Sequence, residues 1–416
     1  MLSRRHFIAT GAAAAGLTWF GPGRAASQEP ATTLRPMTDD VVPIGRPEHL
    51  ARIGRAQALM RAQGLAALLI EPGASMVYFT GVQWHRSERL TAAILPRTGT
   101  PCIVTPHFEE PSVRESLKVP ADVRVWNEDE DPLRTVAGFL ADRRLAGPVG
   151  IEETVRFFAV DNLRRARPGL DIRPGAGVVR GCRMIKSAHE LALMQKAADI
   201  TIAAYRHTWR RIERGMTPAQ IGAIMNGATA SLGGNPEFAL ILLGEASAYP
   251  HGSGQPQRVR DGEVVLMDCG CSVEGYQSDI SRTFVFGEAN EEQRRVWNQM
   301  HEGQRIANAA ARIGRPAGGV DDAVRAQYER WGYGPGYRLP GLSHRTGHGI
   351  GLDGHEPVNL VHGETTPLAA GMCFSNEPGL YLPGKFGIRL EDCFHMTAQG
   401  PRWFSTPPPS LDDPFG

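Results

Sequence analysis

The segments "EVVLMDCG" (263–270) and "DISRTFVFG" (279–287) decide the fold, because each is an apolar run typical of a buried strand. Their valine, isoleucine, threonine and phenylalanine residues favour β structure. Each run nevertheless carries an aspartate, Asp268 in the first and Asp279 in the second. Such breaks in the binary pattern are expected at functional sites, so these acids are candidate ligands or catalysts.

Two later β-rich stretches show the same anomaly. Glu377 lies in "MCFSNEPG" (372–379) and Glu391 lies in "FGIRLEDCFHM" (386–396). A lone buried acid is usually a hydrogen-bonded part of the structure, but four buried carboxylates without cations would repel one another or be protonated. One or two divalent cations would resolve that repulsion. Oxygen ligands with one imidazole, from His348, suit Mn, Fe, Co or Zn.

The histidine belongs to "HRTGHGIGLDGHEP" (344–357), which contains three histidines. His344 and His348 have the i, i+4 spacing by which a zinc-protease helix presents two ligands. Glycines at alternate positions from 347 to 351 disfavour a helix, since each costs about 1 kcal/mol there. An extended backbone would instead spread these two residues and His355 along one wall of a cavity, so His344 and His348 need not face the same metal.

Helix signals separate the β-rich stretches. Ser187 with Glu190 forms a capping box, and Thr217 caps a second helix that has Pro218 at its first position. A third helix is expected to begin after Asn290. Strands that alternate with such helices predict a chain of the α/β (α+β) class.

The region before Cys182 reads as a smaller domain. A helix-like segment (47–63) is followed by short apolar runs at 65–70, 91–96 and 102–105. We therefore predict a small N-terminal α/β domain and a larger C-terminal domain. The predicted boundaries are a signal peptide at 1–26, a linker at 27–45, an N-terminal domain at 46–182 and a C-terminal domain at 183–410.

The composition is that of a soluble globular protein, with 42% hydrophobic and 21% charged residues in 416. This length favours two domains. The formal net charge of +1 gives no reason to expect nucleic acid or an anionic membrane as a partner. The six cysteines form no CxxC pair, so buried free thiols are expected rather than a structural zinc site.

The first residues predict export. Arg4 and Arg5 precede an apolar run from Phe7 to Phe20, and small residues at Ala25 and Ala26 offer a cleavage site. The pattern is similar to a twin-arginine signal, which would place the mature protein in the periplasm or outside the cell. The alternative reading is a membrane anchor, although the run is too short to span a bilayer. No stable membrane span is expected in the mature chain.

Residues 186–396 resemble the metal-dependent "pita-bread" peptidases, which include aminopeptidase P, prolidase and creatinase. The motifs that carry this resemblance are "LMDCG…GYQSDISRTF", "HRTGHGIGL..HEP", "SNEPGLYLPG" and "GIRLED". Residues 47–182, with "VYFTGV" after an apolar strand, resemble the creatinase-type N-terminal domain. The resemblance implies a creatinase-type N-terminal domain followed by a pita-bread domain.

The resemblance also implies a site with two divalent ions. Asp268 would bind one ion through both oxygens, Asp279 and Glu391 would bridge the two, and His348 and Glu377 would complete the second. A hydroxide shared by the ions would be the nucleophile. Glu377 would also be a catalytic proton shuttle. Manganese is favoured, with cobalt, zinc and iron as alternatives.

Further residues are implied to face the substrate. His251 and His355 match catalytic histidines that also bind substrate, and His355 would hold the scissile carbonyl or the intermediate. His344 matches another substrate-side histidine, Arg389 an arginine near the substrate, and Tyr381 an aromatic wall of the pocket. For each of these five the alternative is packing or an ordinary polar role.

Related enzymes are dimers in which the region equivalent to "WHRSERL" (84–90) reaches the partner's active site, so a homodimer is implied. The favoured function is cleavage of Xaa-Pro peptide bonds in small peptides, as an Xaa-Pro aminopeptidase or an Xaa-Pro dipeptidase. One alternative keeps the fold but acts on a small non-peptide, through ectoine-type amide hydrolysis, dimethylsulfoniopropionate lysis or creatinase-like chemistry. The other is a non-catalytic binding module.

Overall fold

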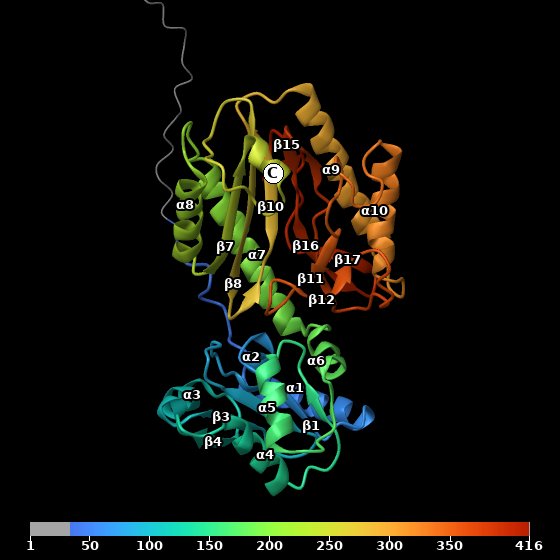
Figure 1. Ribbon diagram of the computed structural model, residues 1–416. Coiled ribbons are helices and arrows are strands. Elements are labelled where there is room, and N and C mark those ends of the chain that lie inside the picture. The colour runs from blue at the N-terminus through green and yellow to red at the C-terminus, as the bar shows by residue number, and fades with distance from the viewer. Residues whose placement is uncertain (1–33, 416) are drawn as a thin grey trace, which may run out of the picture. The chain divides into compact units, whose positions relative to one another are not determined.

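The computed structural model describes residues 34–415, and from Arg35 onward the chain forms one compact unit (Figure 1). The predicted signal peptide (1–26) and residues 27–33 of the predicted linker lie outside the described residues. The export prediction therefore stays a prediction.

The last part of the predicted linker, residues 34–45, contains neither helix nor strand. It is nevertheless bound to the second half of the chain. The backbone N–H of Met37 donates to Leu232 O at 2.8 Å, and Lys196 forms an ion pair with Asp40 at 2.8 Å. These contacts make the segment a fixed part of the structure rather than a free connector.

The first half of the unit is built on a six-stranded mixed sheet in the order β4-β3-β2-β1-β5-β6. Successive residues of the central strand β1 point to opposite faces. Leu68 and Ile70 join one apolar core, while Ala67 and Leu69 join another. Burial on both faces explains the unbroken apolar run. The elements are α1 (Arg46–Ala62), β1 (Ala67–Ile70), α2 (Ala74–Thr80), β2 (Ala92–Pro96), β3 (Cys102–Pro106), a 3₁₀ helix η1 (His107–Glu109), α3 (Glu110–Ser116), β4 (Asp122–Trp126), α4 (Pro132–Asp142), β5 (Val149–Ile151), α5 (Phe157–Ala166), β6 (Ile172–Pro174) and α6 (Ala176–Arg183).

The second half contains two larger sheets. The first has the order β10-β8-β7, with β9 paired to β8, and helices α7 and α8 pack on it (Figure 1). The side chain of Cys271 on β8 points to the face of the sheet that α7 covers, because its Sγ donates to Ala197 O of α7 at 3.3 Å. Asp268, three residues earlier, therefore points to the opposite face. The elements are α7 (Ala188–Trp209), α8 (Pro218–Ser231), β7 (Asn235–Leu243), a 3₁₀ helix η2 (Gly244–Ala248), β8 (Glu263–Val273), β9 (Tyr276–Gln277) and β10 (Ile280–Phe286).

The other sheet has the order β12-β11-β13-β16-β17, and a two-stranded ladder joins β14 to β15. Helices α9 and α10, orange in Figure 1, lie beside these strands, and α9 contributes Trp297 and Met300 to an apolar core shared with them. The elements are α9 (Glu291–Ala310), α10 (Gly318–Arg330), β11 (Gly347–Gly349), β12 (Glu356–Leu360), β13 (Cys373–Asn376), β14 (Leu380–Leu382), β15 (Phe386–Ile388), β16 (Asp392–Thr397) and β17 (Gly400–Trp403).

The helix signals are confirmed. The side chain of Ser187 accepts a hydrogen bond from Glu190 N, and that of Thr217 accepts one from Gln220 N. Asn290 caps α9 in the same way. Each cap satisfies a backbone donor that the first helical turn leaves without a partner. The expected absence of a helix around His348 is also confirmed, since this residue lies on the short strand β11.

One expected β segment differs from the structure. The stretch 386–396 is divided into β15 and β16, and residues 389–391 lie between them. Thr283 of β10 explains the break, because its Oγ1 donates to Arg389 O at 2.6 Å and accepts from Arg389 N at 3.1 Å. Next to it, Ser281 forms an isolated backbone bridge with Glu391. The chain thus passes from the β14–β15 ladder to the five-stranded sheet at residues 389–391, which include the candidate site residues Arg389 and Glu391.

Among the described residues, no helix is both long and apolar enough to cross a bilayer. All six cysteines are buried free thiols, as expected. Burial raises the pKa of Cys373 to about 12, so this thiol stays protonated at neutral pH.

Candidate metal centre

The four acids and one histidine that the sequence predicts as metal ligands lie together where the two larger sheets meet. They are Asp268 on β8, Asp279 directly before β10, His348 on β11, Glu377 directly after β13 and Glu391 directly before β16. Three overlapping groups have ligand atoms that all lie within 4.8 Å of one another. These groups are Asp268, Asp279 and Glu391; His348, Glu377 and Glu391; and Asp279, His348 and His355.

Two serines on the strands donate hydrogen bonds to the candidate ligands. Ser281 stands opposite Asp268 in the β8–β10 ladder, and its Oγ donates to Glu391 Oε2 at 2.9 Å. On the other sheet, Ser375 Oγ accepts from His348 N at 3.0 Å and lies 3.3 Å from Glu377 Oε1, to which it donates. Two of the four carboxylates, those of Glu391 and Glu377, are therefore positioned by serine hydroxyls.

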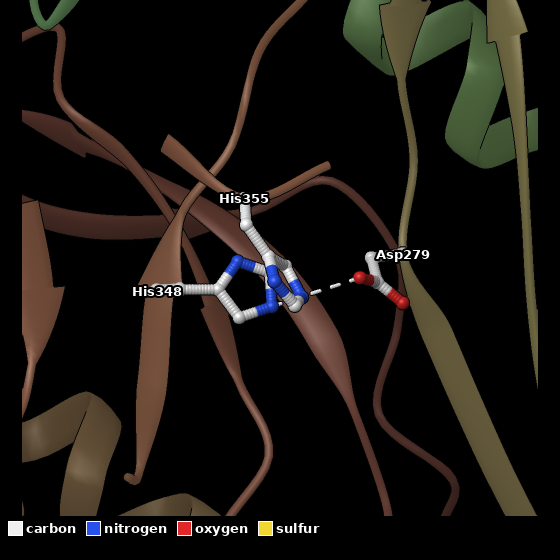
Figure 2. A group of neighbouring side chains, drawn as sticks. All are labelled: Asp279, His348 and His355. Atoms are coloured by element: carbon white, nitrogen blue, oxygen red, sulfur yellow. Dashed lines mark ion pairs between the residues drawn. The ribbon is translucent and has the colours of Figure 1, made fainter. Parts of the chain in front are cut away.

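The tautomer of His348 follows from its contacts. Its Nδ1 lies 3.0 Å from the carbonyl oxygen of Gly349, which can only accept, so Nδ1 carries the proton. Its Nε2 faces the acids, 3.3 Å from Glu377 Oε1 and 3.7 Å from Asp279 Oδ2, and Figure 2 shows the approach to Asp279. With a proton on Nε2 the ring is charged and can donate to Glu377, and a metal would replace that proton. A histidine oriented in this way presents a lone pair to a metal.

The electrostatics of the acids also favour a cation. Burial, reinforced by the neighbouring acids, raises the pKa values of Asp279 and Glu391 well above those of ordinary carboxyls. Burial acts in the same direction on Glu377, but the hydrogen bond and charge of His348 outweigh it and lower the pKa of Glu377 to about 2. Asp279 and Glu391 therefore lie close to other acids whose negative charges oppose their ionisation.

Three buried carboxylate oxygens test whether the site fits metal ions. Asp268 Oδ1, Asp279 Oδ1 and Glu391 Oε1 have no hydrogen-bond partner among the described residues. Such orphaned anionic oxygens are costly unless a ligand satisfies them. One oxygen from each of the three acids, with the lone pair of His348 nearby, is a donor set that suits divalent ions. The residues present therefore fit a metal centre.

His355 lies against the ligand set. Its ring centroid is 4.0 Å from that of His348, and Figure 2 shows the two rings side by side near Asp279. Burial, with the charges of His348 and Arg345, lowers the pKa of His355 to about 4. The ring is therefore neutral at physiological pH and offers one N–H donor. Its Nδ1 lies 3.3 Å from Arg345 Nη2, which donates to it.

His344 and Tyr381 are engaged with each other. His344 Nδ1 lies 2.8 Å from Arg345 O, so it donates there, and its Nε2 accepts the hydroxyl of Tyr381 at 2.8 Å. Burial lowers the pKa of His344, which keeps the ring neutral. Both ring nitrogens are thus occupied by protein groups, and direct contact of this pair with substrate stays a prediction.

Arg389 is buried beneath the acids rather than open to the cavity, with 2% of its surface exposed. Its Nη2 donates to Asp268 Oδ2 at 2.6 Å and its Nε donates to Ser281 Oγ at 3.0 Å. Its Nη1 donates to Pro250 O and to the hydroxyl of Tyr381. The guanidinium therefore connects one candidate ligand, the serine that holds another, and the segment before His251. A substrate contact by Arg389 stays a prediction.

His251 lies on the segment between η2 and β8 and is exposed. It is close enough to His344 and His355 to lower the pKa values of both. It also lines a cavity of about 670 Å³ against α8 and β7. His344, His355 and the five candidate ligands are not among the residues that line this cavity, so a substrate contact by His251 stays a prediction.

The sequence reading missed Ser281, Ser375 and Arg345. Ser281 and Ser375 each lie two residues from a candidate ligand, so the period of a strand places them on the same face and could have identified them. No pattern in the sequence distinguishes Arg345, whose guanidinium meets His355 only because two loops converge.

Comparison with known proteins agrees with this geometry. Residues 52–185 match the Creatinase/Prolidase N-terminal domain, and residues 192–398 match metallopeptidase family M24. The predicted fold class, a creatinase-type N-terminal domain followed by a pita-bread domain, is confirmed.

Individual relatives cover nearly the whole described chain. A protein of Mycobacterium tuberculosis named "Probable dipeptidase PepE" is 32% identical over 85% of this chain and 93% of its own length. An Xaa-Pro dipeptidase of Pyrococcus horikoshii is 28% identical over 82% of this chain and 93% of its own. The crystal structure of dipeptidase PepE from Mycobacterium ulcerans has a TM-score of 0.81 and 32% identity, covering 89% of this chain and 99% of that one. The chain therefore belongs to metallopeptidase family M24 and is a hydrolase of that family.

Proposed function

We propose that this metallopeptidase cleaves Xaa-Pro bonds in small peptides, as an Xaa-Pro dipeptidase or aminopeptidase. The observation that carries the proposal is the set of three orphaned carboxylate oxygens, on Asp268, Asp279 and Glu391, next to the lone pair of His348. The Xaa-Pro specificity is supported by similarity to the Pyrococcus horikoshii Xaa-Pro dipeptidase.

Two divalent ions would be held by two of the side-chain groups. Asp268, Asp279 and Glu391 would hold one ion, and His348, Glu377 and Glu391, with Asp279, would hold the other. When bound, such ions polarise a carbonyl and lower the pKa of water. We propose manganese, because a site of oxygens and one imidazole accepts it, and cobalt, zinc or iron would be accepted by the same donors.

The side chains around the ions would move the protons. Glu377 lies at the edge of the ligand set, and its lowered pKa keeps the carboxylate ionised at neutral pH. It would accept a proton from the attacking water and pass it to the leaving nitrogen. This transfer is needed because the leaving nitrogen of a peptide bond departs as an amine only after it has gained a proton.

The histidines would bind the substrate around that step. Neutral His355 offers an N–H donor beside His348, where a scissile carbonyl oxygen that gains negative charge could be stabilised. His251 would act from the opposite loop on the proline side of the bond. His344, Tyr381 and Arg389 would support that wall through their shared hydrogen bonds.

The test is a comparison of substrates with the purified protein loaded with Mn²⁺. We expect cleavage of Xaa-Pro dipeptides or of Xaa-Pro-Yaa peptides, and at least about 10-fold slower cleavage when alanine replaces proline. The relative rates on the two peptide lengths distinguish a dipeptidase from an aminopeptidase. Absence of proline-dependent cleavage, with turnover of a small amide or of dimethylsulfoniopropionate instead, would contradict the proposal.

We also propose that the protein is exported through the twin-arginine pathway and acts in the periplasm or outside the cell. The support is Arg4 and Arg5 ahead of the apolar run from Phe7 to Phe20. Changing both arginines to lysine should retain the protein in the cytoplasm, as cell fractionation would show. Unchanged export would contradict this.

A homodimer is proposed from the family resemblance. Light scattering on the purified protein would test it, since one chain has a mass of 45.2 kDa before any processing. A monomer mass at micromolar concentration would exclude the dimer.

A further inference from the structure

We propose that Glu356 is a positioning residue for His355, and that Lys186 and Arg183, at the junction of the two domains, hold Glu356 in place. The proposal rests on the function proposed above, because it assigns catalytic work to His355. It adds a role for three charged residues that lie outside the ligand set.

His355 is carried by a loop rather than by a regular element. Residues 350–355 connect β11, which carries His348, to β12, which begins at Glu356. The loop is held to β9 because Gln277 N donates to Gly351 O at 2.8 Å and Gln277 Nε2 donates to Leu352 O at 3.1 Å. These bonds hold the start of the loop but not its end.

The middle of the loop is held by the side chain of Glu356. Its Oε1 accepts from Leu352 N at 3.0 Å and from Asp353 N at 3.2 Å, so the carboxylate folds back beneath the loop. The same oxygen accepts from Arg183 Nη2, and Oε2 accepts from Lys186 Nζ at 2.9 Å. One carboxylate thus has four donors, two from the loop backbone and two from cations.

This cluster is buried, and its charges are matched. The side chains of Lys186 and Glu356 are 3% and 4% exposed. Burial by itself would raise the pKa of Glu356, but Lys186 and Arg183 outweigh it and lower the pKa to about 2. Gly351 permits the packing, since a Cβ there would lie 2.8 Å from Lys186 Cε and 2.8 Å from Glu356 Oε1. The lysine therefore lies against the loop backbone itself.

The cluster continues into the N-terminal domain. Arg183 ends α6, and its Nη1 donates to Ser75 Oγ of α2 at 2.9 Å. Its Nη2 also donates to Asp353 Oδ2 at 2.8 Å, within the His355 loop. A displacement of α2 or α6 would consequently reach the loop through one guanidinium.

His355 depends on this support because its own side chain has few contacts. It meets the His348 ring at 4.0 Å between centroids and Arg345 Nη2 at 3.3 Å. Its position is therefore set by the loop backbone, and a shift of about 1 Å in a catalytic group can cost on the order of 10²-fold in rate.

Glu356→Gln tests the inference. A glutamine can keep either its oxygen toward Leu352, Asp353 and Arg183 or its oxygen toward Lys186, but not both. In either orientation an NH₂ group faces a donor, so at least one of the four hydrogen bonds is lost together with the charge that pairs with Lys186 and Arg183. Lys186→Met is the second variant, because it removes the one donor to Oε2 that the described residues supply and keeps the charge of Glu356.

Glu190→Gln is the matched control. Glu190 is also buried and also pairs with a cation from the N-terminal domain, since Arg52 lies 3.2 Å away and Tyr276 donates to it at 2.7 Å. Its glutamine would still form the capping box with Ser187. This variant therefore removes a comparable buried ion pair that does not touch the His355 loop.

The Mn-loaded enzyme is assayed with an Xaa-Pro substrate, and kcat, KM and metal content are measured. We expect Glu356→Gln and Lys186→Met to keep full metal content and to lower kcat by about 10- to 100-fold, with KM changed less than about threefold. Glu190→Gln should lower the thermal midpoint similarly and leave kcat within about twofold. In a His355→Ala background, Glu356→Gln should lower kcat by less than about twofold more.

Equal kcat losses in Glu356→Gln and Glu190→Gln would overturn the inference, as would a full additional loss in the His355→Ala background or a loss of metal. A wild-type enzyme inactive on every Xaa-Pro substrate would instead contradict the proposed function. The two failures are therefore distinguishable.

Discussion

Two acids at the start of β16 are neighbours in sequence and opposites in environment. Asp392 faces the protein core, where its oxygens accept from Arg282 Nη2 at 2.7 Å, from Gln304 Nε2 at 3.0 Å and from Ser405. Glu391 faces the other sheet, where Ser281 is its hydrogen-bond donor at Oε2 and its Oε1 has no partner among the described residues. Both are essentially buried, with 0% and 2% exposure.

The difference separates a structural acid from a functional one. A buried carboxylate that is fully paired stabilises the fold and needs nothing further. A buried carboxylate left with an orphaned oxygen among other acids is costly in the unliganded protein, and the cost is removed when a cation binds. Burial alone therefore does not distinguish the two roles, whereas the count of donors does.

The largest expected effect on activity comes from changing Glu391. Glu391→Gln should abolish binding of at least one metal and lower kcat/KM by about 10³-fold or more, because it removes a charged ligand. The metal-free variant should be at least as stable as the metal-free wild type, since the mutation relieves repulsion. Metal analysis and thermal unfolding check this, and a strongly destabilised metal-free variant would contradict it.

Asp392→Asn should act on stability instead. Breaking a fully buried ion pair with Arg282 should destabilise the fold by about 3–5 kcal/mol. Denaturant unfolding of the metal-free protein measures this. If the variant unfolds like wild type but binds no metal, Asp392 belongs to the metal site and the distinction between the two acids is wrong.

His348 and His355, whose rings lie against each other, allow a second test that separates a metal ligand from a residue with another role. His348→Ala should remove metal and activity together, because its Nε2 is a candidate ligand. His355→Ala should keep most of the metal and lower kcat by about 10²-fold, the scale of a single oxyanion donor. Metal content per chain decides the matter, and equal metal loss in both variants would make His355 a ligand.

The stability of the metal-free protein should also depend on pH, because Asp279 and Glu391 lie among other buried acids. The folded-state pKa values of Asp279 and Glu391 are raised, so these groups contribute stability at acidic pH that is lost as pH rises above their unfolded values, near 4. The thermal midpoint of the metal-free protein should therefore fall as pH rises from those unfolded values through the raised folded-state pKa values. Saturation with Mn²⁺ should remove this slope and add about 2.7 kcal/mol at 100-fold excess over Kd.

The smallest expected effect is at an exposed histidine. His362 pairs with Asp322 on the surface, and this pair raises the pKa of His362. Although His362 follows the "HGIGLDGHEP" stretch closely, His362→Ala should leave metal content and kcat unchanged. A change in either would extend the site to a residue for which the sequence has no motif.

Local patterns anticipated much of this molecule for definite reasons. The caps at Ser187, Thr217 and Asn290 are short-range hydrogen bonds, so they depend only on residues three apart. The acids in apolar strands were visible because a charge in a buried strand violates the pattern that burial imposes. The break of 386–396 into β15 and β16 was not visible, since it depends on Thr283, more than a hundred residues away.

The sequence by itself determined which side chains could form a metal centre and that the histidines at 344 and 348 do not share a helix. The family resemblance singled out Glu391, but only the tertiary structure showed that Asp392 is fully paired while Glu391 keeps an oxygen without a partner among the described residues, because the two acids meet different sheets. The tertiary structure also decided that Arg389 lies beneath the acids and that Lys186 and Arg183 meet Glu356 across the domain junction. Hydrogen bonds between residues more than a hundred positions apart exist only when the sheets come together, and no local pattern encodes them.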